Sequence, residues 1–158
     1  MGYQVLGGTA DNNSFQIGIV VAKWNSFITD ELLDGAINGL TSSGFDQEQL
    51  IVARCPGAYE IPYTARQLLP KVDGIITLGA VIQGDTPHFD YVCDAVNRGV
   101  TDLNMTGNKP VVFGVLTTDD VEQARERCGL AGDGANKGTE AALALVEMLN
   151  LSNQIDQL

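Results

Sequence analysis

The sequence lacks features on which several common classes of protein depend. Its 158 residues hold nine lysines and arginines against twenty acidic side chains, and the formal net charge is −11. Nucleic acids and anionic membranes are bound through clusters of lysine and arginine, so neither is expected as the main partner. An anionic small ligand would need a local cationic pocket on this acidic background.

Cysteine is also scarce. Cys55, Cys93 and Cys128 are odd in number and show no C-x-x-C spacing, which argues against a disulfide framework and a zinc site, so no metal is expected. Small buried thiols in a reducing compartment are the simplest interpretation. No apolar run approaches the roughly 18 residues that span a bilayer, and no signal peptide is recognisable. A cytoplasmic protein is expected, although an organelle protein without its transit peptide would look the same.

Several nucleotide-binding and nucleophile motifs are absent as well. Neither G-x-x-x-x-G-K-[ST] nor a strand-linked G-x-G-x-x-G occurs, so a nucleoside triphosphate or dinucleotide is not an expected ligand. The chain has no G-x-S-x-G motif of a serine hydrolase, and no cysteine is placed to act with the single histidine.

Apolar runs and amphipathic stretches alternate along the chain. We expect β-strands at residues 15–22, 49–54, 74–82 and 110–116, and α-helices at 29–40, 59–69, 86–104, 119–127 and 137–149. Such alternation predicts a parallel sheet covered on both faces by right-handed crossovers. The predicted fold is one α/β domain spanning residues 1–158, a flavodoxin-like three-layer sandwich with a central four-stranded parallel sheet.

The two ends of the chain are predicted to lie outside this sandwich. Residues 1–14 are Gly-rich and polar, and are expected to be disordered or to add an edge strand to a neighbouring chain. Residues 151–158 are polar and are expected to form a frayed tail.

Ligands of such sheets bind outside the carboxyl ends of the strands. The third predicted strand runs into Gly-Ala-Val-Ile-Gln-Gly-Asp-Thr-Pro-His-Phe-Asp-Tyr, residues 79–91. Thr86 is predicted to cap the next helix and Pro87 to be its first residue, so residues 84–88 should offer free amides to an anion. His88 has a reference pKa of about 6.5 and can exchange protons near neutrality. From this stretch alone, a surface or structural histidine remains the alternative.

Two other strand ends carry candidate ligand-binding residues. Trp24 follows the first strand and can either stack on a flat heterocycle or pack at the rim of the core. Ala58, Tyr59 and Glu60 follow the second strand, at a helix start whose amides and carboxylate suit a polyhydroxylated chain. Glu60 is equally explained as a favourable charge in a first helical turn.

The region after the fourth strand is cationic in three places. Thr118 is interpreted as a structural N-cap. Arg125, Arg127 and Lys137 are the cations best placed to reach an anion, and arginine can hold a phosphate through two parallel hydrogen bonds. For each of them a solvated surface role is the alternative.

Four separated segments resemble lumazine synthase. They are residues 79–92, Pro-Gly-Ala-Tyr-Glu-Ile-Pro at 56–62, Phe-Gly-Val-Leu-Thr-Thr-Asp at 113–119 and Asn-Lys-Gly-Thr-Glu-Ala-Ala at 136–142. The match keeps the family's order and spacing from about residue 15 to residue 149. The resemblance implies the penultimate step of riboflavin biosynthesis: 5-amino-6-(D-ribitylamino)uracil and 3,4-dihydroxy-2-butanone 4-phosphate give 6,7-dimethyl-8-ribityllumazine, phosphate and water. It also implies a homopentamer with active sites between subunits, and no metal or organic cofactor.

The resemblance assigns roles to individual residues. Trp24 matches the aromatic residue that stacks on the pyrimidine, and His88 matches the general acid/base. The remaining matches are Ala58, Tyr59 and Glu60 in the segment that holds the ribityl chain, Val81 and Ile82 as backbone contacts to the pyrimidine, Gly84, Asp85 and Thr86 as the phosphate loop, and Phe113, Arg127 and Lys137 as residues supplied by the adjacent subunit.

The sequence departs from the family pattern in two places. Asp85 adds a negative charge to the phosphate loop, where a solvent-screened carboxylate costs on the order of 1 kcal/mol beside a phosphate. Residues 128–135 lack the lysine that many members carry, and this segment is about two residues longer than in members that build icosahedral shells. The longer segment favours a free pentamer.

Two other functions are compatible with parts of this pattern. A flavin- or lumazine-binding protein without catalytic activity would use Trp24 to stack a tricyclic ring on the same scaffold. A flavodoxin-like electron carrier would share the fold, but it leaves His88 and Arg127 together unexplained.

Overall fold

The computed structural model of the chain describes residues 2–11 and 14–158. Within these residues, four parallel strands form one sheet in the order β2-β1-β3-β4. They are β1 (Ile17–Ala22), β2 (Leu50–Cys55), β3 (Gly74–Ile82) and β4 (Val111–Thr118). The predicted bounds of β3 are confirmed, and the other strands differ only slightly at their ends. This is the flavodoxin-like order, with its topological switch point between β1 and β3.

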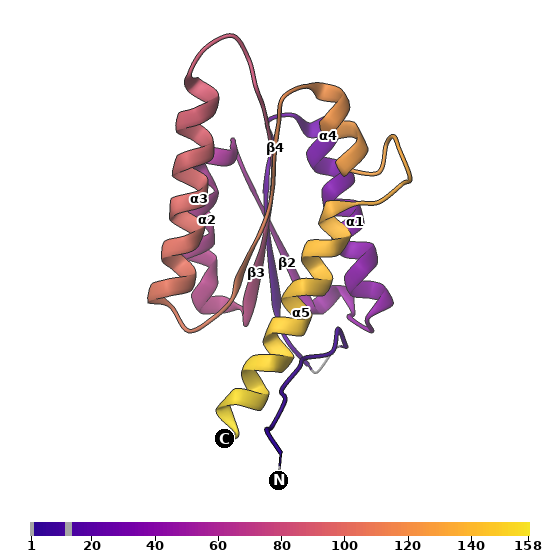
Figure 1. The fold of residues 1–158 in the computed structure, drawn as a ribbon, viewed down its shortest axis with the longest axis vertical. Helices are drawn as coiled ribbons and strands as arrows, with labels where there is room; N and C mark the ends of the chain where they lie inside the picture. The colour runs from indigo at the N-terminus through magenta and orange to yellow at the C-terminus, as the bar shows by residue number, and fades with distance from the viewer. Residues whose placement is uncertain (1, 12–13) are drawn as a thin grey trace.

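Helices cover both faces of the sheet. Figure 1 shows α2 (Ile61–Leu68) and α3 (His88–Thr106) on one face, and α1 (Ser26–Ser42), α4 (Val121–Arg127) and α5 (Lys137–Asp156) on the other. Each face has its own apolar core, around Leu32 and Leu145 on one side and Ile61 and Val96 on the other. Because β1 and β3 are buried between the two cores, β1 is apolar throughout and β3 is apolar except for Thr77. The predicted three-layer sandwich is confirmed.

The predicted start of α1 is wrong. The helix begins at Ser26 rather than Thr29, and no acidic residue lies in its first turn. Asn25, before the helix, adopts a left-handed conformation with φ of 61°, which reverses the chain directly after the strand. Thr29 is completely buried inside the helix, and its hydroxyl has no hydrogen-bond partner among the described residues.

Two predicted N-caps are also wrong. Thr86 does not cap α3, because Pro87 occupies the cap position and His88 is the first helical residue. Thr118 does not cap α4; the Asp120 carboxylate accepts from the Gln123 amide at 2.8 Å instead. In both cases the turn after the strand continues longer than the local sequence suggests.

Short 3₁₀ turns replace the ends of another predicted helix. The expected helix at 59–69 consists of a turn at Ala58–Glu60, the helix α2, and a further turn at Leu69–Lys71 that contains Pro70. A third such turn, Gln47–Gln49, leads into β2. These turns bring the chain back to the sheet over few residues.

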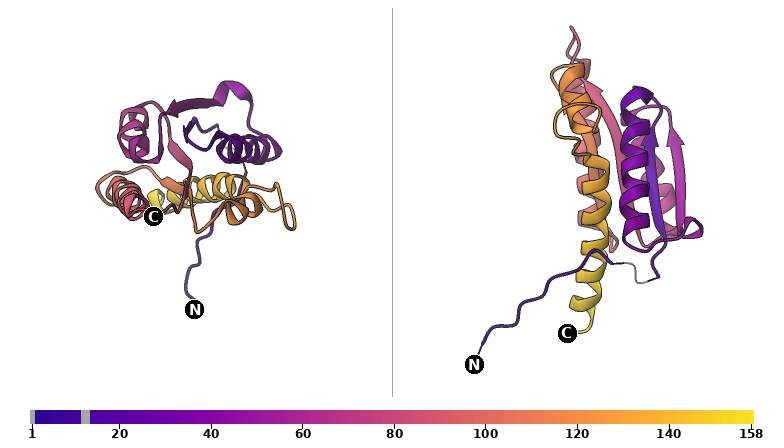
Figure 2. Two further views of the ribbon diagram at one scale, coloured as in Figure 1. Left: turned by 90° about the horizontal axis from the view of Figure 1, so that it is seen from above. Right: turned by 90° about the vertical axis from the view of Figure 1, so that its right-hand side faces the viewer.

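The prediction of a frayed tail is wrong as well, because α5 continues to Asp156 rather than ending at Leu149. Its last turns contact the N-terminal arm of the same chain, as Figure 2 shows. Gln154 donates to the Gly7 carbonyl at 2.9 Å and accepts from its amide at 3.2 Å. Asn150 donates to the carbonyls of Thr9 and Asp11 at 2.7 and 2.9 Å. Pairing of the arm with a neighbouring chain stays a prediction.

No helix in the described part of the chain is both long enough and apolar enough to cross a membrane.

Candidate functional site

A hollow of about 500 Å³ opens at the carboxyl ends of β1, β2 and β3. We call it the switch-point hollow, because it lies where ligands bind in sheets of this order. Three loops and the start of α3 form its walls. Its lining residues are Trp24, Asn25, Pro56, Gly57, Ala58, Tyr59, Glu60, Ala80, Val81, Ile82, Gly84, Thr86, His88, Phe89 and Val92.

Trp24 is held by its backbone while its ring stays accessible. Its amide donates to the Pro56 carbonyl at 3.0 Å, continuing the β1–β2 ladder past the strands. The residue is 74% exposed, so one face of the indole is available for stacking on a heterocycle. Asn25 closes the turn by donating its side-chain amide to the Ala80 carbonyl at 2.8 Å. Sequence reasoning missed Asn25, although asparagine is the residue type that, besides glycine, most readily adopts a left-handed conformation.

The segment after β2 contributes one buried and two exposed residues. Ala58 is buried, whereas the side chains of Tyr59 and Glu60 are exposed at the mouth of the hollow. The Glu60 amide donates to the Gly57 carbonyl at 3.2 Å. The Glu60 carboxylate makes no hydrogen bond to a described residue, so it can accept from ligand hydroxyl groups.

Cys55 lies beside this segment but is not poised as a nucleophile. The thiol is buried and donates to the Gly57 carbonyl at 3.4 Å. Burial raises the pKa of Cys55 above its ordinary value, so the thiol stays protonated and unreactive near neutrality.

The loop between β3 and α3 extends beyond the sheet (Figure 1) and brings free amides to the hollow. The ladder ends at Gln83, whose amide donates to Thr118 at 2.9 Å. The amides of residues 84–86 make no hydrogen bond within the described chain, and they lie at the positive end of α3. Gly84 and Thr86 line the hollow, whereas Asp85 is exposed outside its lining. The anion-binding role of the loop is thus compatible with its geometry.

His88 is the first residue of α3 and lines the same hollow. Its imidazole is exposed and makes no hydrogen bond to a described residue, so both ring nitrogens are available to a ligand. The ionisable residues of the lining are Tyr59, Glu60 and His88, and no lysine or arginine is among them. A bound phosphate would therefore meet backbone amides here but no permanent cation.

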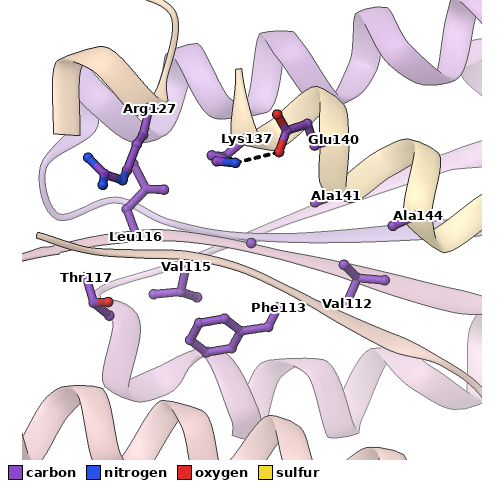
Figure 3. A pocket seen from close by; sticks show the side chains of 11 residues that line it. Val112, Phe113, Val115, Leu116, Thr117, Arg127, Lys137, Glu140, Ala141 and Ala144 are labelled. Carbon is purple, nitrogen blue, oxygen red and sulfur yellow. Dashed lines mark hydrogen bonds and ion pairs between the residues drawn. The ribbon is translucent and has the colours of Figure 1, made fainter. Parts of the chain in front are cut away.

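A second hollow of about 400 Å³ lies along β4, an edge strand of the sheet (Figure 3). We call it the β4 hollow; α4 and α5 contribute its cations. Phe113 is 41% exposed, and its ring lies on the opposite side of β4 from Arg127 and Lys137 (Figure 3). Arg127 donates to the Gln123 carbonyl at 3.2 Å, while Lys137 forms an ion pair with Glu140 at 2.7 Å. Arg127 thus keeps more of its charge available than Lys137.

The structure divides the predicted site residues into two groups. The two hollows share no lining residue, so Phe113, Arg127 and Lys137 do not meet His88 within one chain. Arg125, a third candidate cation, lines neither hollow and pairs with Glu122 at 3.6 Å.

Within residues 2–11 and 14–158, no group of three or more histidine, cysteine, aspartate or glutamate side chains is arranged to hold a metal ion.

Comparison with known proteins relates the whole fold to one family. Residues 14–153 match the family model described as 6,7-dimethyl-8-ribityllumazine synthase. A protein of that name from Parabacteroides distasonis is 46% identical over 144 residues, which cover 90% of this chain and 89% of that protein. Another of the same name, from Desulfatibacillum aliphaticivorans, is 44% identical over 153 residues, covering 96% and 97% of the two chains.

Proposed function

The chain belongs to the 6,7-dimethyl-8-ribityllumazine synthase family, transferases of riboflavin biosynthesis, and from this premise we propose its reaction. It condenses 5-amino-6-(D-ribitylamino)uracil with 3,4-dihydroxy-2-butanone 4-phosphate to 6,7-dimethyl-8-ribityllumazine, and His88 is the general acid/base. The observation that carries the proposal is the gathering of an exposed indole, a free carboxylate, unpaired amides and the single histidine around the switch-point hollow.

The ring substrate occupies the part of the switch-point hollow nearest β1. Its pyrimidine stacks on Trp24, and the backbone of Val81 and Ile82 contacts its polar edge. The ribityl hydroxyls donate to the Glu60 carboxylate and accept from the amides of Ala58 and Tyr59. This placement directs the 5-amino group toward His88.

The butanone phosphate binds with its phosphate at residues 84–86. The 5-amino nitrogen then attacks the ketone carbon, and loss of water gives an imine. Loss of a proton from the hydroxyl-bearing carbon and of phosphate from its neighbour then gives an enol, which tautomerises to a ketone. Attack of the ribitylamino nitrogen on this new carbonyl closes the second ring with loss of water. His88 takes and returns the protons of these steps; its support is an exposed imidazole that lines the hollow in which both substrates are proposed to bind.

A neighbouring chain completes each site. The β4 hollow offers Phe113 together with Arg127 and Lys137, and these two residues are the permanent cations that the switch-point hollow lacks. A head-to-tail contact that joins the two hollows forms a ring when the rotation between neighbouring chains closes, and we propose such a ring of five chains, a free homopentamer. Small-molecule substrates are then the main partners, and a cytoplasmic location keeps Cys55, Cys93 and Cys128 reduced.

The proposed reaction has a direct test. Incubation of the purified protein with both substrates is expected to produce lumazine fluorescence and one phosphate for each lumazine. Omission of either substrate is the control. Absence of product from well-folded protein would contradict the proposed reaction.

A flavin- or lumazine-binding protein is the second candidate, because Trp24 is exposed enough to stack a tricyclic ring. That function predicts yellow protein and quenching of Trp24 fluorescence by riboflavin, with no product from the two substrates. An electron carrier of the same fold would additionally show a reversible flavin redox couple.

A further inference from the structure

Asn136 makes four hydrogen bonds between α1, α4 and α5. Its side-chain oxygen accepts from the amides of Gly138 and Thr139 at 2.8 and 3.2 Å, which caps α5. Its side-chain nitrogen donates to the carbonyls of Glu31 and Cys128 at 2.9 and 2.8 Å. One neutral amide thus satisfies groups on three elements that are distant in sequence.

Cys128 and Asn136 are the direct sequence neighbours of the two cations of the β4 hollow. Arg127 directly precedes Cys128, and Lys137 directly follows Asn136. An isolated antiparallel bridge pairs Cys128 with Asn136, so the two ends of the loop between them are held together. The spacing of the two cations is therefore determined by this bridge.

The surrounding packing leaves Asn136 little freedom. A Cβ atom on Gly35 of α1 would overlap the Asn136 side chain, and one on Gly138 would overlap the Leu32 carbonyl. Thr139 adds a hydrogen bond from its hydroxyl to the Gly35 carbonyl at 2.9 Å. Glycine at these two positions lets α1 and α5 approach closely enough for the amide to reach both helices.

The loop at residues 129–135 lies beyond this bridge. Gly129, Gly132 and Gly134 all adopt positive φ, between 73° and 87°, and residues 132–135 are exposed. Its internal hydrogen bond, from the Ala135 amide to Asp133 at 2.9 Å, does not involve either cation. The Leu130 amide ties the start of the loop to the Arg125 carbonyl at 3.0 Å, so only the part after Leu130 is expected to vary in length without moving Arg127 or Lys137.

We propose that Asn136 is the positioning residue of the phosphate-binding cations. Its side-chain amide fixes the spacing between Arg127 and Lys137 and makes that spacing independent of the length of the 129–135 loop. The proposal rests on the proposed function, in which these cations bind the phosphate of the butanone substrate. It also explains how a longer loop is compatible with an unchanged site.

The test uses Asn136→Ser, which stays neutral and retains a good N-cap acceptor but removes both donated hydrogen bonds. KM for the butanone phosphate is expected to rise about tenfold, with KM for the ribitylaminouracil unchanged, because Trp24 and Glu60 lie in the other hollow. The matched control inserts Gly-Gly after Gly132, beyond the bridge, and is expected to leave both KM values unchanged.

Three outcomes would overturn the proposal: an unchanged KM for the phosphate substrate in Asn136→Ser, an equal rise in both KM values, or a rise in the insertion variant. If Asn136→Ser does not fold, the insertion variant alone still decides whether the spacing depends on the length of the loop.

Amide hydrogen exchange tests the role of Asn136 independently of whether the protein catalyses the proposed reaction. If the wild-type protein forms no product, the proposed function fails, but the role of Asn136 is still measurable. In Asn136→Ser, exchange at Leu130, whose amide donates to Arg125 at 3.0 Å, is expected to accelerate. Gly138 and Thr139 are expected to keep their protection because the serine still caps α5. Unchanged exchange at Leu130 would contradict the positioning role.

Discussion

Replacement of His88 by alanine is expected to lower kcat by about 10²- to 10⁴-fold, the usual contribution of general acid/base catalysis. The reaction should be slowed rather than abolished, because holding two substrates in a reactive orientation supplies much of the remaining acceleration. His88 makes no hydrogen bond to a described residue and is exposed, so the melting temperature should not change. Steady-state kinetics together with thermal unfolding measure both effects.

Added imidazole provides the matching control for this variant. A small general acid/base in solution should restore part of the lost turnover in His88→Ala and have little effect on the wild type. Wild-type turnover in His88→Ala would exclude the assigned role, and a large fall in melting temperature would make the histidine structural.

Arg127→Ala is expected to raise KM for the butanone phosphate about 10- to 100-fold, the range of one lost hydrogen bond to a charged group. The expectation follows from the partners of the two cations. Among the described residues, the Arg127 side chain bonds only to the Gln123 carbonyl, whereas Lys137 is paired with Glu140, so Lys137→Ala should have the smaller effect. KM for the ribitylaminouracil should stay the same in both variants.

Arg125→Ala is the control for nonspecific loss of positive charge. Arg125 lies on the same short helix but pairs with Glu122 and lines neither hollow. Its replacement should leave KM for the phosphate substrate unchanged. Equal increases of KM in Arg125→Ala and Arg127→Ala would show that the phosphate responds to the overall charge of the protein and not to a direct contact with Arg127.

The strands of the sheet were predictable because each buried strand appears in the sequence as a short run of mostly apolar residues. Gly74–Ile82 is apolar except for Thr77 and is bounded by polar residues, and burial on both faces favours that pattern. Helix starts were less predictable. Thr29, Thr86 and Thr118 are all good capping residues, but the positions of Asn25, Pro87 and Asp120 decide where the helices begin. Capping depends on turn conformation, which residue type alone does not determine.

The length of α5 depends on contacts that are remote in sequence. Asn150 and Gln154 lie in a polar stretch that reads as a frayed end. Their side chains instead bind the backbone of residues 7–11, and a pairing over such a separation has no local signal.

The candidate site was predictable in part for the same reason. Trp24, Glu60 and His88 follow different strands, and the parallel sheet brings its strand ends to one edge, where all three line one hollow. The separation of Arg127 from His88 was implied by family resemblance rather than by the residues themselves. Asn25 and Asn136 escaped notice because their roles lie in hydrogen bonds to distant carbonyls.

Co-expression of His88→Ala with Arg127→Ala tests most directly whether two chains form each site. Mixed assemblies carrying a different affinity tag on each variant are purified on both tags, and kcat/KM for the butanone phosphate is measured. In a closed head-to-tail ring with random mixing, about one quarter of the sites pair an intact His88 with an intact Arg127. The account predicts recovery of about that fraction of wild-type kcat/KM. Activity no higher than the mean of the two parent variants would show that each chain builds its site alone. That result would contradict the claim that two neighbouring chains form each site.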